Sequence, residues 1–257
     1  MALLLLKIIL APALVGGASL LGRKFGPRVS GWVIGFPLVA GPVLWFYARE
    51  QGAEFAARAA AATLLGLLSL CVFLLAYVWS ARHFGWLPSV LLGWVGFVAA
   101  TLAIDRVPWL GHASWPAGLL MASAALWATM LLLPRVPARP PSRPPRYDLA
   151  LRLVATALLV ITLTGTAHLL GPGLSGLFTP FPVATSILVV FAHREAGASG
   201  VLAVYAGFLP GLYSFASFCA ALSFGLGRWS VAVAFVVALL ITLVCQTFVL
   251  KVVNRQM

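Results

Sequence analysis

Two Phe-Pro pairs, Phe36-Pro37 and Phe181-Pro182, lie inside long apolar stretches and are the first candidates for a binding site. Proline removes a backbone hydrogen bond from a helix and clashes with the preceding turn, so each pair predicts a kink or a break. Backbone groups freed within a membrane need protein, water or solute as partners, because lipid offers none. The predicted substrate-binding residues are these two pairs and three nearby hydroxyl residues, Thr179, Thr185 and Ser186. The alternative is that the prolines only shape helices for packing, since proline is frequent in membrane helices.

Carboxylates are scarce in this chain, and they are Glu50, Glu54, Asp105, Asp148 and Glu195. Glu50 and Glu195 each follow an arginine and precede a glycine by two positions. A carboxylate beside an arginine suits a gate or a proton-coupling site, so we predict that Arg49, Glu50, Arg194 and Glu195 act in gating or coupling. The alternative is a polar turn that caps the helix, because adjacent residues on a helix point in different directions.

Motifs of the common enzyme classes are missing from the sequence. It has no Walker motif, no GxGxxG that follows a strand, no GxSxG and no HExxH or CxxC spacing,. We therefore expect no catalytic residue, no cofactor and no metal ion, and predict that the chain is not an enzyme. His168 is a candidate because an ionisable group within a membrane span is a functional candidate by default, although its depth near the end of the span argues against this role. His193 is expected in a loop or at an interface. The span residues Thr101, Gln246 and Thr247 are expected to join helices, with Thr101 equivalent to Thr247 after one gap.

Composition identifies the elements that must position these residues. Of the 257 residues, 62% are hydrophobic and 9% are charged, against about 25% charged in soluble domains. A helix needs roughly 20 apolar residues to cross a membrane, whereas a barrel strand needs about ten. The runs match the helix length, so we predict an all-α polytopic membrane bundle with nine spans. They cover residues 2–21, 30–48, 58–80, 86–104, 109–133, 149–170, 174–192, 199–224 and 229–250.

Residues 26–76 and 171–221 align without a gap at one constant offset. Shared positions include Gly26/Gly171, Pro27/Pro172, Ser30/Ser175, Gly31/Gly176, Phe36/Phe181, Pro37/Pro182, Arg49/Arg194, Glu50/Glu195, Gly52/Gly197, Gly66/Gly211 and Ser69/Ser214. An internal repeat of this kind defines the domain organisation. We predict a four-span unit at 1–105, a linker span with a Pro/Arg-rich loop at 106–148, and a second four-span unit at 149–257. Five crossings separate equivalent helices, so the second unit is expected to be inverted relative to the first.

The net charge of +12 is explained by membrane topology. With nine spans, twelve Lys and Arg residues fall on one side and four on the other, Lys7 lying within the first span. Basic residues concentrate in cytoplasmic loops, so the N-terminus is expected outside and the C-terminus in the cytoplasm. A nucleic-acid partner is therefore not expected. The basic loop at 134–146 is expected to link the halves, with attraction to anionic lipid as the alternative.

The Ser-Gly-x4-Phe-Pro stretch followed by a Glu-x-Gly turn resembles, in each half, the small GlpM-like bacterial inner-membrane proteins. These proteins are roughly one repeat long, and the likeness covers two spans per half. It implies a bacterial inner-membrane protein built from a short four-helix unit. It implies no substrate and no catalytic residue.

These features predict a small secondary transporter or exporter, because paired Gly/Pro-interrupted helices in two inverted halves mark transporter binding sites. The alternative is a membrane-embedded lipid-handling protein of the flippase kind, or an assembly protein without a solute path. The expected partners are the lipid bilayer and a small-molecule or lipid substrate, and a homo-oligomer is compatible with the sequence. A transporter should have a polar cavity at the interruptions, a scaffold should seal them with apolar packing, and a lipid handler should open a lateral groove to the bilayer.

Overall fold

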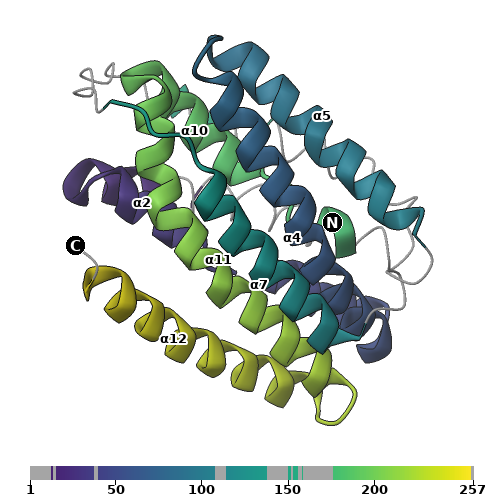
Figure 1. The fold of residues 1–257 in the computed structure, drawn as a ribbon. Coiled ribbons are helices and arrows are strands. Elements are labelled where there is room, and N and C mark those ends of the chain that lie inside the picture. The colour runs from purple at the N-terminus through teal and green to yellow at the C-terminus, as the bar shows by residue number, and fades with distance from the viewer. Residues whose placement is uncertain are drawn as a thin grey trace.

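The computed structural model describes residues 13, 16–37, 40–107, 114–137, 150–151, 153–155, 158 and 176–255, which form helices and no strand (Figure 1). Six helices in this part of the chain are long and apolar enough to cross a membrane. They cover Ala53–Ser80, Trp86–Asp105, Trp115–Leu132, Gly176–Ala196, Ala198–Leu226 and Val231–Val249. The chain is therefore a helical integral membrane protein.

The named helices follow one another as short and long elements. They are α2 (Pro27–Ile34), α3 (Ala40–Glu50), α4 (Ala53–Ser80), α5 (Trp86–Asp105), α7 (Trp115–Leu132), α10 (Val183–Ala196), α11 (Ala198–Leu226) and α12 (Val231–Arg255). The span predicted at 30–48 is divided between α2 and α3. The spans predicted at 2–21 and 149–170 lie largely outside the described residues.

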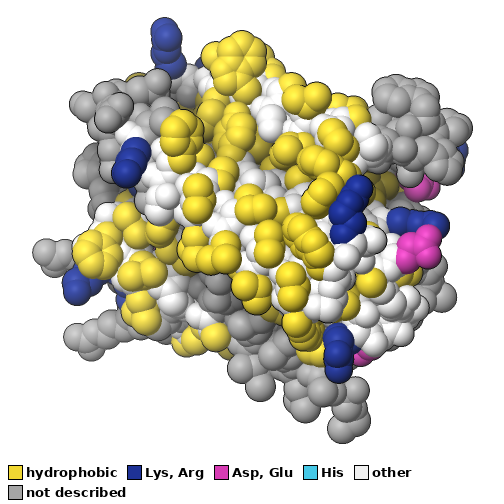
Figure 2. Space-filling view, turned by 90° about the horizontal axis from the view of Figure 1, so that it is seen from below, with side chains coloured by type: hydrophobic (Ala, Val, Ile, Leu, Met, Phe, Trp, Pro, Cys, Tyr) yellow, Lys and Arg dark blue, Asp and Glu magenta, His cyan; other side chains and the backbone are white. Residues whose placement is uncertain are grey.

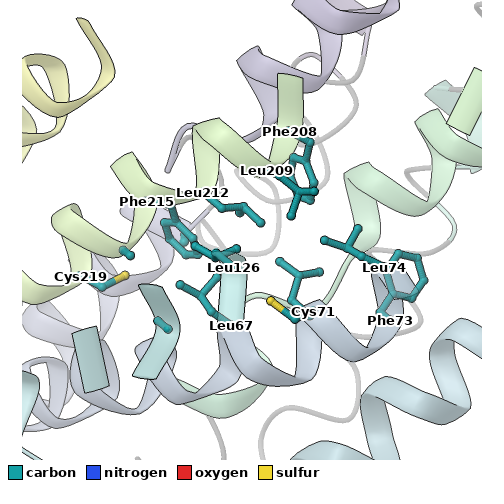
Figure 3. Packing of buried hydrophobic residues seen from close by; sticks show 14 of the residues in the cluster. Leu67, Cys71, Phe73, Leu74, Leu126, Phe208, Leu209, Leu212, Phe215 and Cys219 are labelled. Atoms are coloured by element: carbon teal, nitrogen blue, oxygen red, sulfur yellow. The ribbon is translucent and has the colours of Figure 1, made fainter. Parts of the chain in front are cut away.

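Helices α4 and α11 form the centre of the molecule, and Figure 1 shows them running in opposite directions. Their most apolar segments are 67% and 72% buried, against 28%, 22% and 28% for α5, α7 and α12. Figure 3 shows the same antiparallel arrangement in the core, where Phe215 and Cys219 lie toward Leu67 while Phe208 lies toward Leu74. The outer helices therefore supply the surface that faces lipid.

Large apolar side chains cover that outer surface. Val95, Leu120, Trp127 and Val244 are 62% to 72% exposed. Figure 2 shows one face on which hydrophobic side chains spread over the middle and Lys and Arg lie mostly toward the margins. A surface of this kind is stable in a hydrocarbon layer, where apolar side chains need no water.

Helix starts repeat at the same offset as the residues of the sequence repeat. Helix α11 begins at Ala198, the equivalent of Ala53 at the start of α4, and α12 begins at Val231, the equivalent of Trp86 at the start of α5. Without a gap, Thr101 corresponds to Gln246. The pairing of Thr101 with Thr247 requires one gap within these helices and stays a prediction.

Candidate functional site at the helix interruptions

The first interruption separates α2 from α3, and Phe36 and Pro37 lie within it. The Phe36 amide donates a hydrogen bond to the Val33 carbonyl at 3.3 Å, and the Gly41 amide donates to the Pro37 carbonyl at 2.8 Å. Pro37 has no N–H to continue the ladder, so the backbone leaves the helix here and starts a new one. Pro37 is buried and Phe36 is half-buried.

The second interruption precedes α10 and has the same backbone pattern. The Phe181 amide donates to the Phe178 carbonyl at 3.0 Å, and the Ser186 amide donates to the Pro182 carbonyl at 2.8 Å. Both bonds join the repeat equivalents of the residues that are bonded in the first interruption. The Phe-Pro pair therefore imposes the same local geometry in both halves.

The first interruption packs directly against α11 through glycines. A Cβ atom on Gly31 would lie 2.1 Å from the Val204 carbonyl oxygen, and one on Gly35 would lie 2.8 Å from the Gly211 Cα. Only glycine allows backbones to approach this closely, as is common at helix interfaces in membranes. Helix α2 of the first half is therefore tied to the long helix of the second half.

The second interruption packs in the same way against α4. A Cβ atom on Gly176 would lie 2.5 Å from the Ala59 carbonyl oxygen, and one on Gly66 would lie 2.7 Å from the Pro180 Cγ. Gly176, Pro180, Ala59 and Gly66 are the repeat equivalents of the four residues of the first contact. Each half of the sequence therefore packs against the other half through equivalent residues.

The predicted binding residues of the second half gather around Trp94 of α5. The Trp94 Nε1 donates a hydrogen bond to the Ser186 Oγ at 2.9 Å. The Phe181 ring lies 5.1 Å from the Phe97 ring and 6.2 Å from the Trp94 ring, between centroids. Thr185 is buried beside Ser186, and Thr179 is half-buried within the interruption. In this conformation both interruptions are packed against neighbouring helices, which is the arrangement expected of the scaffold alternative rather than of an open polar cavity. Phe36-Pro37 lies on α11 rather than in this cluster.

The predicted gating pairs occupy two short turns at opposite ends of the bundle (Figure 1). Arg49 and Glu50 are exposed at the end of α3. Arg194 is exposed with its guanidinium 6.0 Å from the Trp86 ring centroid, and Glu195 is half-buried. Each turn closes on a glycine with positive φ, 94° at Gly52 and 65° at Gly197. A side chain would be strained there, which explains why glycine recurs in both Arg-Glu-x-Gly elements.

His193 lies in the last turn of α10 rather than in a loop, and its expected place at a membrane interface stays a prediction. It belongs to α10, is 9% exposed, and its Nδ1 lies 3.3 Å from the Tyr77 hydroxyl of α4. The sequence carries no local sign of this contact, because the two residues are 116 positions apart. His168 lies outside the described residues.

Several buried polar side chains were not singled out as binding residues by the sequence. Their side-chain polar atoms have no hydrogen-bond partner among the described residues, and they belong to Trp32, Ser69, Thr101, Tyr205, Ser214 and Gln246. Most buried polar groups in proteins are paired, and for these atoms the described residues do not supply the partner,. Two pairs of them, Ser69/Ser214 and Thr101/Gln246, are equivalent at the offset of the repeat. That coincidence was available in the sequence, but their burial was not.

Comparison with protein-family models, with curated proteins and with solved structures finds no match for this chain. The chemistry of the interruptions is accordingly judged from the residues themselves. They offer hydroxyl groups and aromatic rings, and the segments 30–48, Ala198–Leu226 and 231–250 contain no charged residue. Such a set can bind through hydrogen bonds and apolar contact.

Proposed function

We propose that the chain is a small secondary transporter or exporter in which two inverted four-helix repeats alternate access to a central site. The reciprocal glycine contacts carry this proposal. Gly31 lies against Val204 and Gly176 lies against Ala59, so the contact made by each half is returned by the other at equivalent positions. Reciprocal contacts of this kind arise when a pseudo-twofold axis relates two halves, because the axis makes their interface self-complementary.

The direction of the central helices favours an axis in the membrane plane. A twofold axis along the membrane normal would leave equivalent helices parallel, whereas α4 and α11 run antiparallel (Figure 1). Inverted repeats around interrupted helices are the common plan of secondary transporters, in which the halves exchange conformations to switch access. Under this proposal each interrupted helix moves along the long helix of the other half. Glycine at the contact has no side chain that would block this movement.

We also propose that the N-terminus lies outside and the C-terminus in the cytoplasm of a bacterial inner membrane. Among the described residues, Arg82 and Arg135 follow the ends of α4 and α7 at one end of the bundle. Arg49, Arg106 and Arg228 lie at the other end, where α3, α5 and α11 finish. The end that also carries Lys24 and Lys251 is assigned to the cytoplasm by the positive-inside rule.

Accessibility of single cysteines tests the transport proposal. Pro37→Cys and Pro182→Cys are made separately in a chain whose Cys71, Cys219 and Cys245 are replaced by alanine. A membrane-impermeant maleimide is then added to whole cells and to inverted vesicles. We expect each position to be labelled from one side more than the other, and the preference of position 37 to oppose that of position 182, because the halves alternate.

Two control variants calibrate the labelling. Val95→Cys faces lipid and should stay unlabelled, whereas Arg58→Cys lies in the exposed first turns of α4 and should react. If Arg58→Cys reacts while positions 37 and 182 never do, the interruptions are permanently sealed. The transport proposal would then be abandoned in favour of an assembly protein without a solute path.

A lipid-handling protein is the second candidate, favoured by one observation on the outer face of α12. An apolar hollow lies there, lined by Leu240, Ile241, Val244, Cys245 and Phe248. Its lining has no polar side chain that could hold a headgroup, so it suits an acyl chain only. Val244→Trp would fill the hollow. Lipid movement between leaflets is then measured in vesicles that contain this variant. Lipid handling would be supported if the variant lost this movement and if cysteines at positions 37 and 182 were never labelled.

A further inference from the structure

The turn between α4 and α5 carries exposed aromatic side chains at the end of two membrane-spanning helices. Trp79 is 46% exposed, Phe84 55% and Trp86 39%. Helix α4 ends at Ser80 and α5 begins at Trp86, so these rings lie where both helices leave the hydrocarbon layer. Tryptophan at this depth contacts acyl chains and lipid headgroups together.

Two arginines of different helices lie on the tryptophans of this turn. The guanidinium carbon of Arg82 is 4.7 Å from the Trp79 ring centroid. That of Arg194, in the last turn of α10, is 6.0 Å from the Trp86 ring centroid. Both arginines are exposed. A guanidinium over an aromatic ring is attracted by the ring face and still has several N–H donors for an anion.

The end of α7 reaches the same turn. The Trp79 Nε1 donates a hydrogen bond to the carbonyl of Leu132, the last residue of α7, at 3.1 Å. Arg135 follows three residues later and is exposed, so its Cα lies within about 11 Å of the Leu132 Cα. We define the arginine rim as the exposed side chains at this end of the bundle, namely Trp79, Arg82, Phe84, Trp86, Arg135 and Arg194.

Charge is distributed unevenly between the two ends of the bundle. Beside the three arginines of the rim, the described part of the chain places one carboxylate, the half-buried Glu195. At the opposite end, where α4 starts and α5 and α11 finish, arginines and carboxylates are nearly balanced, and Arg58 is paired with Glu54 (Figure 1). The charged residues there are Arg49, Arg58, Arg106, Arg228, Glu50, Glu54 and Asp105. An anionic partner therefore complements the rim and not the opposite end.

An apolar stripe runs from the rim along the outer side of α5. Its members are spaced three or four residues apart, which places them on one face of the helix. They are 36% to 65% exposed, and they are Leu87, Leu91, Val95, Val98 and Leu102. The stripe is about 22 Å long at a rise of 1.5 Å per residue, and one leaflet of hydrocarbon is about 15 Å thick. An acyl chain whose headgroup lies at the rim has apolar contact along its whole length.

We propose that the arginine rim binds an anionic phospholipid of the phosphatidylglycerol kind, with Arg82 and Arg194 as donors to its phosphate and an acyl chain along the α5 stripe. Arginine binds phosphate through charge-assisted, often paired hydrogen bonds. A zwitterionic lipid is disfavoured because its own cation already balances the phosphate. The assignment rests on Arg82 and Arg194 rather than on the basic loop at 134–146, and it does not depend on the transport proposal.

Lipid binding by the purified full chain in mild detergent tests the proposal. Phosphatidylglycerol and phosphatidylcholine with the same acyl chains are titrated separately, and native mass spectrometry measures the fraction of protein that retains one lipid. We expect phosphatidylglycerol to bind on the order of tenfold more tightly or better. The double variant Arg82→Gln/Arg194→Gln should bind phosphatidylglycerol about 25-fold more weakly, because each basic residue near an anionic headgroup contributes about fivefold.

Matched variants separate headgroup binding from a general effect of charge. Arg58→Gln/Arg228→Gln removes the same number of arginines at the opposite end and should leave phosphatidylglycerol binding unchanged. Arg82→Lys/Arg194→Lys keeps the charge but loses the paired hydrogen bonds, so its binding should fall between that of the natural chain and that of the Gln variant. The single variants Arg82→Gln and Arg194→Gln should each weaken binding about fivefold, and they serve as the test if the double variant does not fold.

Three results would overturn the proposal: equal binding of the two lipids, unchanged binding by the variant Arg82→Gln/Arg194→Gln, or an equal loss in the variant of the opposite end. Glycerol 3-phosphate, which has the phosphate but no acyl chain, is added as a soluble competitor. It should not displace phosphatidylglycerol at equal concentration. Displacement would identify a site for soluble phosphates and would also refute the lipid assignment.

Discussion

Replacing Gly31 by alanine should separate α2 from α11 and destabilise the protein. The new Cβ atom would lie 2.1 Å from the Val204 carbonyl oxygen, whereas ordinary contact begins at 3.4 Å, so the helices must part by about 1.3 Å. Overpacking costs roughly 1 to 3 kcal/mol, and a clash with backbone belongs at the upper end. Alanine regains about 1 kcal/mol through its higher helix propensity. We therefore expect a net loss of about 2 kcal/mol in the free energy of unfolding.

Unfolding in mixed detergent micelles, followed by circular dichroism, measures this change. Gly176→Ala should also destabilise the protein but by less, since its Cβ would lie 2.5 Å from the Ala59 carbonyl oxygen. Gly17→Ala is the control, because the helical Gly17 has nothing within 4 Å of its Cβ position. It should be neutral or gain about 0.5 to 1 kcal/mol. A Gly31→Ala protein as stable as the Gly17→Ala protein would refute the close crossing of α2 and α11.

Three further substitutions probe contacts between the halves and the turns. Trp94→Phe removes the donor to Ser186 and should cost about 1 kcal/mol of unfolding free energy, with no such loss for the same change at the exposed Trp127,. Tyr77→Phe removes the hydroxyl beside His193 and should cost a similar amount in chemical unfolding; unchanged stability would show that the contact contributes nothing,. Gly197→Ala forces a side chain into a positive-φ conformation and should cost about 1 to 3 kcal/mol, whereas alanine at Gly17 tests the same change without that strain,.

Part of the candidate site could be predicted from local chemistry. Proline acts on its own backbone, so Phe36-Pro37 and Phe181-Pro182 marked both helix interruptions without any knowledge of their neighbours. The partners of these segments could not be predicted in this way. Gly211 contacts Gly35 from the other half of the sequence, and no spacing rule connects them.

Burial was the other property that local patterns did not reveal. Gln246 was expected to join helices, yet it has no described hydrogen-bond partner and is buried. In a chain that is 62% hydrophobic, apolar periodicity distinguishes poorly between a face that meets lipid and one that meets protein,. Val244 and Gln246, two positions apart on α12, illustrate this, because the first is 69% exposed and the second 4%.

The order of residues alone established an all-helical membrane protein with helix interruptions at the two Phe-Pro pairs, and an internal repeat in a single register. These conclusions follow from hydrophobic run length, from proline geometry and from identity at a constant offset. Tertiary structure decided which helices touch, namely that α2 lies on α11 while Gly176 and Pro180 lie on α4. It also decided that Ser214 and Gln246 are buried without described partners. The physical reason is that close packing depends on pairs of surfaces brought together from distant positions, whereas helix formation and its interruption depend on neighbouring residues.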